Sequence, residues 1–248
     1  MTDALYLHDA YLRRFTGHVV AHGDGSTVLL DRTAFYPTGG GQPSDTGSLR
    51  TSSGPVWRVG SVEKGPDGVR HILEPTAPPP AVGEEVEGET DWPLRHRHMR
   101  YHTFLHLLSG VVYHRFASGI TGGQIHADRA RMDFSLPTFS KEVAQELLDE
   151  VNRRAAGDLP VSVRFIPRAE LERDPALVRV ARDLLPDVDP VRLIDIGGFD
   201  VQADGGTHVR STREVGRARI ERLENKGARN KRLYVVLEEA TAEEAHGP

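Results

Sequence analysis

The sequence changes character near Asp91, and this change divides the chain into two structurally different parts. Before it, short β-prone runs are separated by Gly-Asp and Asp-Gly pairs, which are typical of tight turns between strands. Three prolines at 78–80 exclude a helix interior from the stretch that leads to the change, because proline lacks the backbone N–H that a helix needs. We therefore expect a small β-barrel in residues 1–90 and a second domain in residues 91–248.

The second domain mixes helices with strands. Residues 94–117 repeat apolar side chains at helical spacing over several turns. Residues 139–156 predict a second amphipathic helix capped by the Ser140 hydroxyl, and residues 169–185 predict a shorter helical segment. The remaining runs predict strands, including a final pair joined by a basic turn. The expected fold class is α+β, a small N-terminal β-barrel followed by a two-layer α+β domain.

The absence of cysteine restricts the metal sites that this chain can build. Any bound metal must be held by histidine and carboxylate side chains. The chain has no run of about 18 apolar residues, and its N-terminus lacks the apolar core of a signal peptide. We therefore expect a cytoplasmic protein with no membrane partner. A formal net charge of −5 argues against a protein that coats nucleic acid non-specifically.

Two histidines, His102 and His106, lie four residues apart on the first predicted helix. Residues at this spacing share a helical face, so both imidazoles can reach one metal ion. With twelve histidines in the chain, such a pair also arises by chance, and the alternative is a helix surface with one or two partly buried histidines. A zinc protease needs a glutamate after the first histidine, and Thr103 at that position removes most support for a peptidase.

A second motif, Asp204-Gly-Gly-Thr-His208, offers an oxygen and a nitrogen ligand at the two ends of a tight turn. Together with His102 and His106, these residues form a four-ligand set suited to zinc. A catalytic zinc commonly keeps three protein ligands and leaves one position for water or substrate. The alternative is a plain glycine turn in which Asp204 makes a local hydrogen bond.

Two further segments could contact a ligand. Residues 35–47 contain three consecutive glycines that could line an anion or ligand site with backbone groups, although a structural hairpin is the alternative. They match neither a phosphate-binding P-loop nor a dinucleotide fingerprint. Residues 216–232 carry seven Lys/Arg and two Glu, which predicts a local basic surface for nucleic acid or, alternatively, a solvated face.

Taken in this order, the motifs resemble those of the alanyl-tRNA editing family, which comprises the AlaX proteins and the editing domain of alanyl-tRNA synthetase. That family carries an HxxxH motif and, later in the chain, a Cys-Gly-Gly-Thr-His motif. The matching segments here are residues 35–47, 102–110, 121–135 and 205–209. The resemblance covers nearly the whole chain and implies an N-terminal barrel followed by an editing domain.

The resemblance implies hydrolysis of the ester bond in tRNA(Ala) that is mischarged with serine or glycine, with no obligate protein partner. It also implies Zn²⁺ as the cofactor. Where the family has its cysteine, this chain has Asp204, so three outcomes are open: a site of three histidines and one aspartate, a weaker three-histidine site, or no metal. We expect zinc or another divalent ion on His102, His106 and His208, with Asp204 as fourth or outer ligand.

The resemblance assigns roles to further residues. Catalytic roles are assigned to His102, His106 and Thr121. Thr121 is included because it lies near the position of the family's serine-sensing threonine. The substrate-binding residues would be Thr103, Gly39, Gly40, Gly41, Gln42 and Asp45. The basic surface predicted for residues 216–232, and not the resemblance, supplies the residues expected to contact tRNA phosphates, which are Arg217, Lys226, Arg229, Lys231 and Arg232. Two rivals remain: a catalytically inactive tRNA-binding homologue, and an editor of another mischarged tRNA such as the threonine-specific one.

Overall fold

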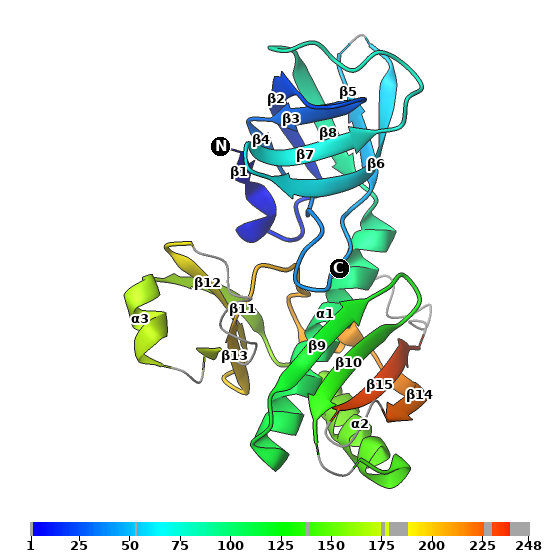
Figure 1. The fold of residues 1–248 in the computed structure, drawn as a ribbon, viewed down its shortest axis with the longest axis vertical. Helices are drawn as coiled ribbons and strands as arrows, with labels where there is room; N and C mark the ends of the chain where they lie inside the picture. Colours follow the sequence, from blue (N-terminus) through cyan, green and yellow to red (C-terminus); the bar gives the residue numbers. More distant parts are fainter. Residues whose placement is uncertain are drawn as a thin grey trace. The chain divides into compact units, whose positions relative to one another are not determined.

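The structure is a computed structural model that describes residues 2–52, 54–136, 139–174, 177–178, 188–225 and 230–238. The chain forms two compact units, Met1–His98 and Met99–Pro248. Helix α1 (Trp92–Phe116) begins in the first unit and continues into the second (Figure 1). No helix among the described residues is both long and apolar enough to cross a membrane.

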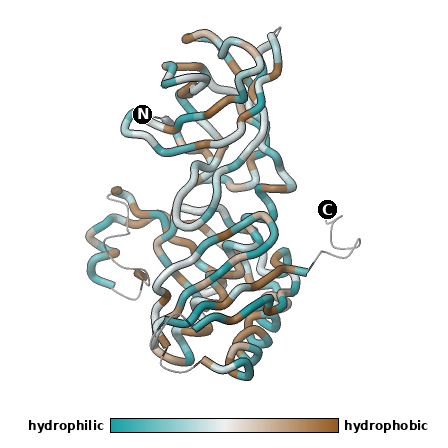
Figure 2. Tube along the Cα trace, turned by 45° about the vertical axis from the view of Figure 1, so that its right-hand side comes forward, coloured by the Kyte–Doolittle hydropathy of each residue, from teal (hydrophilic) through white to brown (hydrophobic). Residues whose placement is uncertain are grey.

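The first unit is a closed β-barrel, as the sequence predicted. Among the described residues, its strands in order around the barrel are β2 (Arg14–His22), β3 (Thr27–Leu30), β7 (Gly68–Leu73), β6 (Val56–Gly65), β5 (Gly47–Arg50) and β8 (Glu85–Thr90). Two short strands, β1 (Asp3–Ala4) and β4 (Arg32–Thr33), pair in parallel beside it. Along most of β2 and throughout β7, buried residues alternate with exposed or partly buried ones, so every second residue faces the barrel core. In Figure 2, hydrophobic (brown) and hydrophilic (teal) positions are interspersed along the chain.

The glycine-rich segment between β4 and β5 forms a tight hairpin turn. Gly39 and Gln42 exchange backbone hydrogen bonds of 3.1 and 2.9 Å across it. The two central residues, Gly40 and Gly41, have φ angles of 57° and 78°, which only glycine adopts without strain. The Tyr36 hydroxyl donates to the Gly39 carbonyl at 2.8 Å and closes the turn. Two of the three consecutive glycines are therefore required by the backbone of the turn.

A buried ion pair fixes this glycine-rich segment to the start of α1 within the first unit. Arg95 and Asp45 both have fully buried side chains, and the guanidinium donates two hydrogen bonds from Nε to the carboxylate at 2.7 and 2.8 Å and a further bond from Nη2. Arg95 also donates to the carbonyl oxygens of Ala10 at 2.9 Å and Ala34 at 2.5 Å. Asp45 accepts the Tyr36 N–H at 2.6 Å. Both charges are thus satisfied without water.

A histidine lies inside the barrel core. The Nδ1 of His71 donates to the Val28 carbonyl at 3.2 Å, while Nε2 lies 2.8 Å from the Thr33 hydroxyl. That hydroxyl oxygen also accepts the N–H of Phe35 at 3.1 Å. Burial lowers the pKa of His71 to about 4, and the hydrogen bond to Val28 only partly opposes this effect. The imidazole is therefore neutral in the folded barrel at neutral pH.

The second unit combines two antiparallel sheets with helices, which confirms the predicted α+β class. In the described part, one sheet has the strand order β14 (Ala218–Asn225), β15 (Asn230–Leu237), β10 (Ala130–Ser135) and β9 (Ile120–Ile125). The other sheet contains β11 (Val161–Ile166), β12 (Val191–Ile196) and β13 (Asp200–Ala203). Residues 101–112 of α1 are all buried.

The two remaining helices correspond to segments that the sequence predicted. Helix α2 (Lys141–Ala156) begins after Ser140, whose hydroxyl accepts the Val143 N–H at 3.3 Å and confirms the predicted cap. Helix α3 (Arg168–Arg173) occupies the start of the predicted 169–185 segment, most of which lies outside the described residues. Leu171 of α3 packs in a small core beneath the β11–β13 sheet, with Leu193 of β12.

The Arg95–Asp45 pair can be tested by removing one charge. We expect Arg95→Met to lower the free energy of unfolding by about 3–5 kcal/mol, because it leaves a buried carboxylate without its partner. Urea unfolding followed by tryptophan fluorescence measures the change. As a control, Arg50→Met breaks an exposed pair with Glu87 and should change the stability little. Equal losses of stability in the two variants would contradict a special role of the buried Arg95–Asp45 pair.

The buried His71 predicts a pH dependence. His71 takes up a proton near pH 6.5 in the unfolded chain but only near pH 4 in the folded barrel. The stability that the neutral, buried His71 contributes is therefore complete above about pH 6.5 and falls as the pH drops toward 4. The resulting loss in the free energy of unfolding reaches about 3 kcal/mol. Urea unfolding at pH 7 and pH 4.5 should show a smaller loss for His71→Gln than for wild type. His98, whose pKa burial also lowers to about 4, contributes equally in both proteins. Matching losses would refute the assignment to His71.

Candidate metal centre

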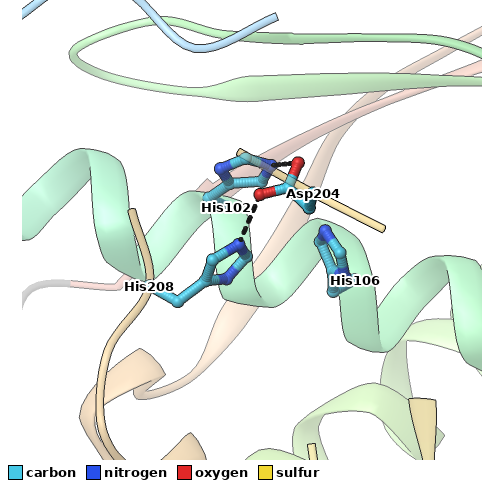
Figure 3. A group of neighbouring side chains, drawn as sticks. All are labelled: His102, His106, Asp204 and His208. Atoms are coloured by element: carbon cyan, nitrogen blue, oxygen red, sulfur yellow. Dashed lines mark hydrogen bonds and ion pairs between the residues drawn. The ribbon is translucent and has the colours of Figure 1, made fainter. Parts of the chain in front are cut away.

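Four side chains converge within the second unit (Figure 3). His102 and His106 project from one face of α1, one helical turn apart. Asp204 and His208 come from the loop that follows β13. One ligand atom from each of the four residues lies within 4.8 Å of all the others. The three histidines are buried, with exposed fractions of 4–8%.

The distances within this cluster fit a single metal ion. Asp204 Oδ2 lies 3.1 Å from His208 Nε2, and Asp204 Oδ1 lies 3.5 Å from His102 Nε2. Ligand atoms around a tetrahedral zinc lie about 3.3 Å apart, given metal–ligand bonds of about 2.0–2.1 Å. The imidazole centroids are separated by 4.4 Å (His102 and His208), 4.7 Å (His106 and His208) and 5.3 Å (His102 and His106). This set of nitrogen and oxygen donors could bind a divalent metal.

Two neighbouring side chains orient the imidazoles of His106 and His208. His106 Nδ1 lies 3.2 Å from the buried Asp200 carboxylate, which also accepts a 2.6 Å hydrogen bond from Gln202. His208 Nδ1 lies 3.0 Å from the Thr103 hydroxyl. In each case a proton on Nδ1 leaves the Nε2 lone pair available as a metal ligand. A hydrogen bond from the second ring nitrogen to an acceptor such as a carboxylate is the usual support of a histidine metal ligand.

The backbone of the second motif fits closely against the cluster. A Cβ on Gly206 would lie 2.1 Å from His102 Cε1, so glycine is required at this position. The N–H of Gly206 donates to Asp204 Oδ2 at 2.5 Å. Arg192 of β12 donates to the carbonyl oxygens of Asp204 at 2.9 Å and Gly206 at 2.8 Å. By contrast, Gly205 has open space where its Cβ would lie.

The electrostatics of the cluster match the protonation states that a metal requires. Burial by itself would raise the pKa of Asp204, but its interactions with His102, His208 and His106 outweigh this effect and hold the pKa well below its usual range. Burial and the neighbouring His102 and His106 lower the pKa of His208, against the opposing effect of Asp204. A carboxylate and a neutral imidazole are the forms that coordinate metal ions.

The other residues selected from the sequence lie in varied environments. Thr121 is exposed on β9, whereas Thr103 is fully buried behind His208. The residues of the glycine motif belong to the barrel unit, where Asp45 pairs with Arg95; they are Gly39, Gly40, Gly41, Gln42 and Asp45.

The basic residues near the C-terminus do not form one uniform group. Arg217 is exposed, but the Arg232 side chain donates to Asp133 at 2.6 and 2.8 Å. The side chain of Lys231 is largely buried. Lys226 and Arg229 lie outside the described residues.

Sequence reasoning missed two residues that support the site, Asp200 and Arg192. A strand period of two places Asp200, Gln202 and Asp204 on one face, so the pattern Asp-Val-Gln-Ala-Asp contained a signal for Asp200. Arg192 becomes visible only from strand pairing, because it lies beside Asp204 through the register of two adjacent strands.

Comparisons with known proteins agree with this geometry. A family model described as "Threonyl and Alanyl tRNA synthetase second additional domain" matches residues 191–234, and one described as "tRNA synthetases class II (A)" matches residues 13–94. The chain is 39% identical to the alanyl-tRNA editing protein AlaX-M of Saccharolobus solfataricus, across 96% of this chain and 99% of that protein. The AlaX-M of Methanosarcina acetivorans is 38% identical with the same coverage. An alanine–tRNA ligase of Pyrobaculum neutrophilum is 38% identical over 90% of this chain, which corresponds to 25% of the ligase.

The role of Asp200 can be measured directly. We expect Asp200→Asn to weaken binding of Zn²⁺ or Co²⁺ by about 10–100-fold, because His106 loses the carboxylate that orients it. Competition with a chromophoric chelator gives the affinity without reference to any activity. The same chemical change at the exposed Asp149 of α2 serves as the control. An unchanged affinity in Asp200→Asn would remove Asp200 from the metal centre.

Proposed function

Because this chain belongs to the AlaX-M family of alanyl-tRNA editing proteins, we propose that it is an aminoacyl-tRNA deacylase that hydrolyses Ser-tRNA(Ala) and Gly-tRNA(Ala) and spares Ala-tRNA(Ala). The observation that carries this proposal is the buried cluster of His102, His106, Asp204 and His208. Its residues come from the two motifs on which the resemblance to the editing family rests. The aspartate occupies the position of the family's cysteine.

We propose Zn²⁺ as the metal, held by the three histidines with Asp204 as the fourth ligand. A bound zinc would polarise the ester carbonyl or position a water molecule for attack on it. Three imidazoles and a carboxylate suit zinc, although a carboxylate is a harder ligand than a thiolate. The hydrogen bond from the Gly206 N–H and the proximity of His208 hold the carboxylate of Asp204 in place, and Thr103 fixes the ring of His208.

Selectivity for serine over alanine requires a partner for the extra substrate hydroxyl. A site that hydrogen-bonds a hydroxyl strongly disfavours an analogue that lacks it. We assign this role to Thr121, since its side chain is exposed on β9. Thr103 is fully buried and already bonded to His208 and to the N–H of Val209, so it supports the cluster and does not contact substrate.

The remaining assignments concern the tRNA. We propose that the glycine motif, from Gly39 to Asp45, helps to position the aminoacyl end of the substrate. Arg217, with an exposed side chain, is suited to contact a phosphate, whereas Lys231 is largely buried and Arg232 is already bonded to Asp133. Such contacts position the substrate without reading its sequence.

Two alternative functions are an inactive tRNA-binding homologue and an editor of another mischarged tRNA. A homologue that binds tRNA without hydrolysing it would not need three histidines with orienting partners, and the presence of Asp200 and Thr103 behind two of them favours the active enzyme. The match of residues 191–234 to a domain shared by threonyl and alanyl synthetases favours, as the second candidate, an editor of mischarged threonine-specific tRNA.

The test is deacylation of Ser-tRNA(Ala), Ala-tRNA(Ala) and Ser-tRNA(Thr) by the metal-loaded protein. Wild type should release serine from tRNA(Ala) and leave Ala-tRNA(Ala) intact. Asp204→Ala should lower both the metal affinity and the serine release by about tenfold or more, because the cluster loses its carboxylate. Absence of serine release from tRNA(Ala) by wild type would reject the proposal, and release from tRNA(Thr) alone would establish the second candidate.

The same assay examines Thr121 with a matched pair of variants. Thr121→Val keeps the shape of the side chain and removes its hydroxyl, whereas Thr121→Ser keeps the hydroxyl. Serine release should fall in the first variant and persist in the second. Equal serine release in both would exclude Thr121 as the hydroxyl partner.

A further inference from the structure

A glycine lies on the side of α1 that bears the metal ligands. Four residues of this helix follow one another at intervals of four, and they are His102, His106, Gly110 and His114. Residues at this spacing lie along one side of a helix, so Gly110 is one turn beyond the second ligand. Glycine favours a helix interior less than alanine does. The reason for a glycine at this position lies in the segment that packs against it.

The segment that packs against Gly110 is the turn between β12 and β13. Gly197 and Gly198 shape this turn with φ angles of 55° and 71°. A Cβ at position 110 would lie 2.7 Å from Phe199 Cε1 and 3.3 Å from Asp200 Oδ1. The first of these distances is shorter than Cβ atoms in proteins keep from other atoms. Glycine therefore leaves the space in which the Phe199 ring and the Asp200 carboxylate approach the helix.

The Phe199 ring is held by side chains from two helices. The guanidinium of Arg154 on α2 lies 3.7 Å from the ring centroid, which is the geometry of a cation–π contact. Arg154 is itself fixed by hydrogen bonds of 3.0 and 2.7 Å to Glu150. On α1, the His114 ring lies 5.1 Å from the Phe199 ring, and His114 Nε2 donates to the Phe199 carbonyl at 3.0 Å. The turn is thus attached to both α1 and α2.

Asp200 directly follows Phe199, so a shift of the ring moves the backbone that carries the carboxylate. Its Oδ2 lies 3.2 Å from His106 Nδ1. We propose that Gly110 and Phe199 are positioning residues of the metal centre. Their close contact sets the Asp200 carboxylate at hydrogen-bond distance from His106. This inference rests on the proposed function, because it concerns the metal centre assigned there.

The surroundings of Asp200 determine what a displaced carboxylate loses. Its Oδ2 also accepts a 2.6 Å hydrogen bond from Gln202, which lies two residues further along the same strand. A shift of β13 moves both of these residues together and keeps their hydrogen bond. The contact with His106 joins β13 to α1, so the same shift breaks it. His106 then loses the acceptor that orients its ring toward a metal ion.

The experiment measures the affinity for Zn²⁺ and Co²⁺ by competition with a chromophoric chelator. Gly110→Ala should weaken binding by about tenfold, as expected when a histidine ligand loses its orienting group. Alanine is the better helix former, so a role of Gly110 in helix formation alone would leave the affinity unchanged. Phe199→Leu keeps an apolar side chain but removes the ring, and it should weaken binding by a smaller factor. The absorption spectrum of the Co²⁺-loaded protein should change in both variants.

Two backgrounds test whether Gly110 acts through the neighbouring turn. In Asp200→Ala, the added substitution Gly110→Ala should cause little further loss of affinity, because the contact with His106 is already absent. In Phe199→Ala the extra methyl group has space, so Gly110→Ala should again cause little further loss. Ser109→Ala is the matched control at the adjacent position. The Ser109 hydroxyl is buried without a hydrogen-bond partner among the described residues, and this variant should bind metal as wild type does.

The outcomes separate this inference from the proposed function. Equal metal affinities of wild type and Gly110→Ala overturn the positioning role, as does a loss that persists in full in the Asp200→Ala background. If Gly110→Ala does not fold, an unchanged affinity in Phe199→Leu overturns it. A protein that binds metal in the expected pattern but hydrolyses no aminoacyl-tRNA rejects the proposed function and leaves the positioning role intact. A wild-type protein that binds neither ion overturns both the metal centre and this inference.

Discussion

The burial of polar side chains along α1 is the constraint on which the rest of the structure depends. A helix that is enclosed on all sides usually carries apolar residues, because an unpaired polar group away from water costs several kcal/mol. Here α1 buries Arg95, His102, Thr103 and His106. Each of these side chains must meet a partner supplied by another segment. Those partners determine which loops pack against the helix and at which positions along it.

Two segments that are distant in sequence from α1 provide these partners. In the barrel unit, Asp45 neutralises Arg95 and so fixes the glycine-rich turn to the first turns of the helix. In the second unit, Asp200 and the 204–208 loop surround His102 and His106. Two buried atoms on α1, His98 Nδ1 and Ser109 Oγ, have no hydrogen-bond partner among the described residues. The polar groups of α1 therefore organise the local structure of both units.

Much of this architecture follows from local sequence patterns. Turn signals between β-prone runs predicted the barrel, helical spacing predicted α1 and α2, and the two motifs predicted all four members of the cluster. Asp200 and Arg192 were not predicted, because their positions depend on the register between β12 and β13. The burial of residues 101–112 of α1 on every side was also not predicted, because apolar residues at helical spacing indicate only one buried face. Asp45 was selected as a substrate-binding residue, and only its tertiary contact reveals the ion pair with Arg95.

The presence of Asp204 where the editing family has its cysteine changes how the cluster responds to oxidants. A thiolate is converted by peroxide to sulfenic acid and then to irreversibly oxidised forms, and each conversion alters a metal ligand. The cluster here contains only imidazole and carboxylate groups, and the whole chain has no cysteine. Peroxide therefore finds no sulfur in this centre to attack. A site built only from imidazole and carboxylate groups cannot lose a ligand by thiol oxidation, so peroxide does not release a bound metal from it by that route.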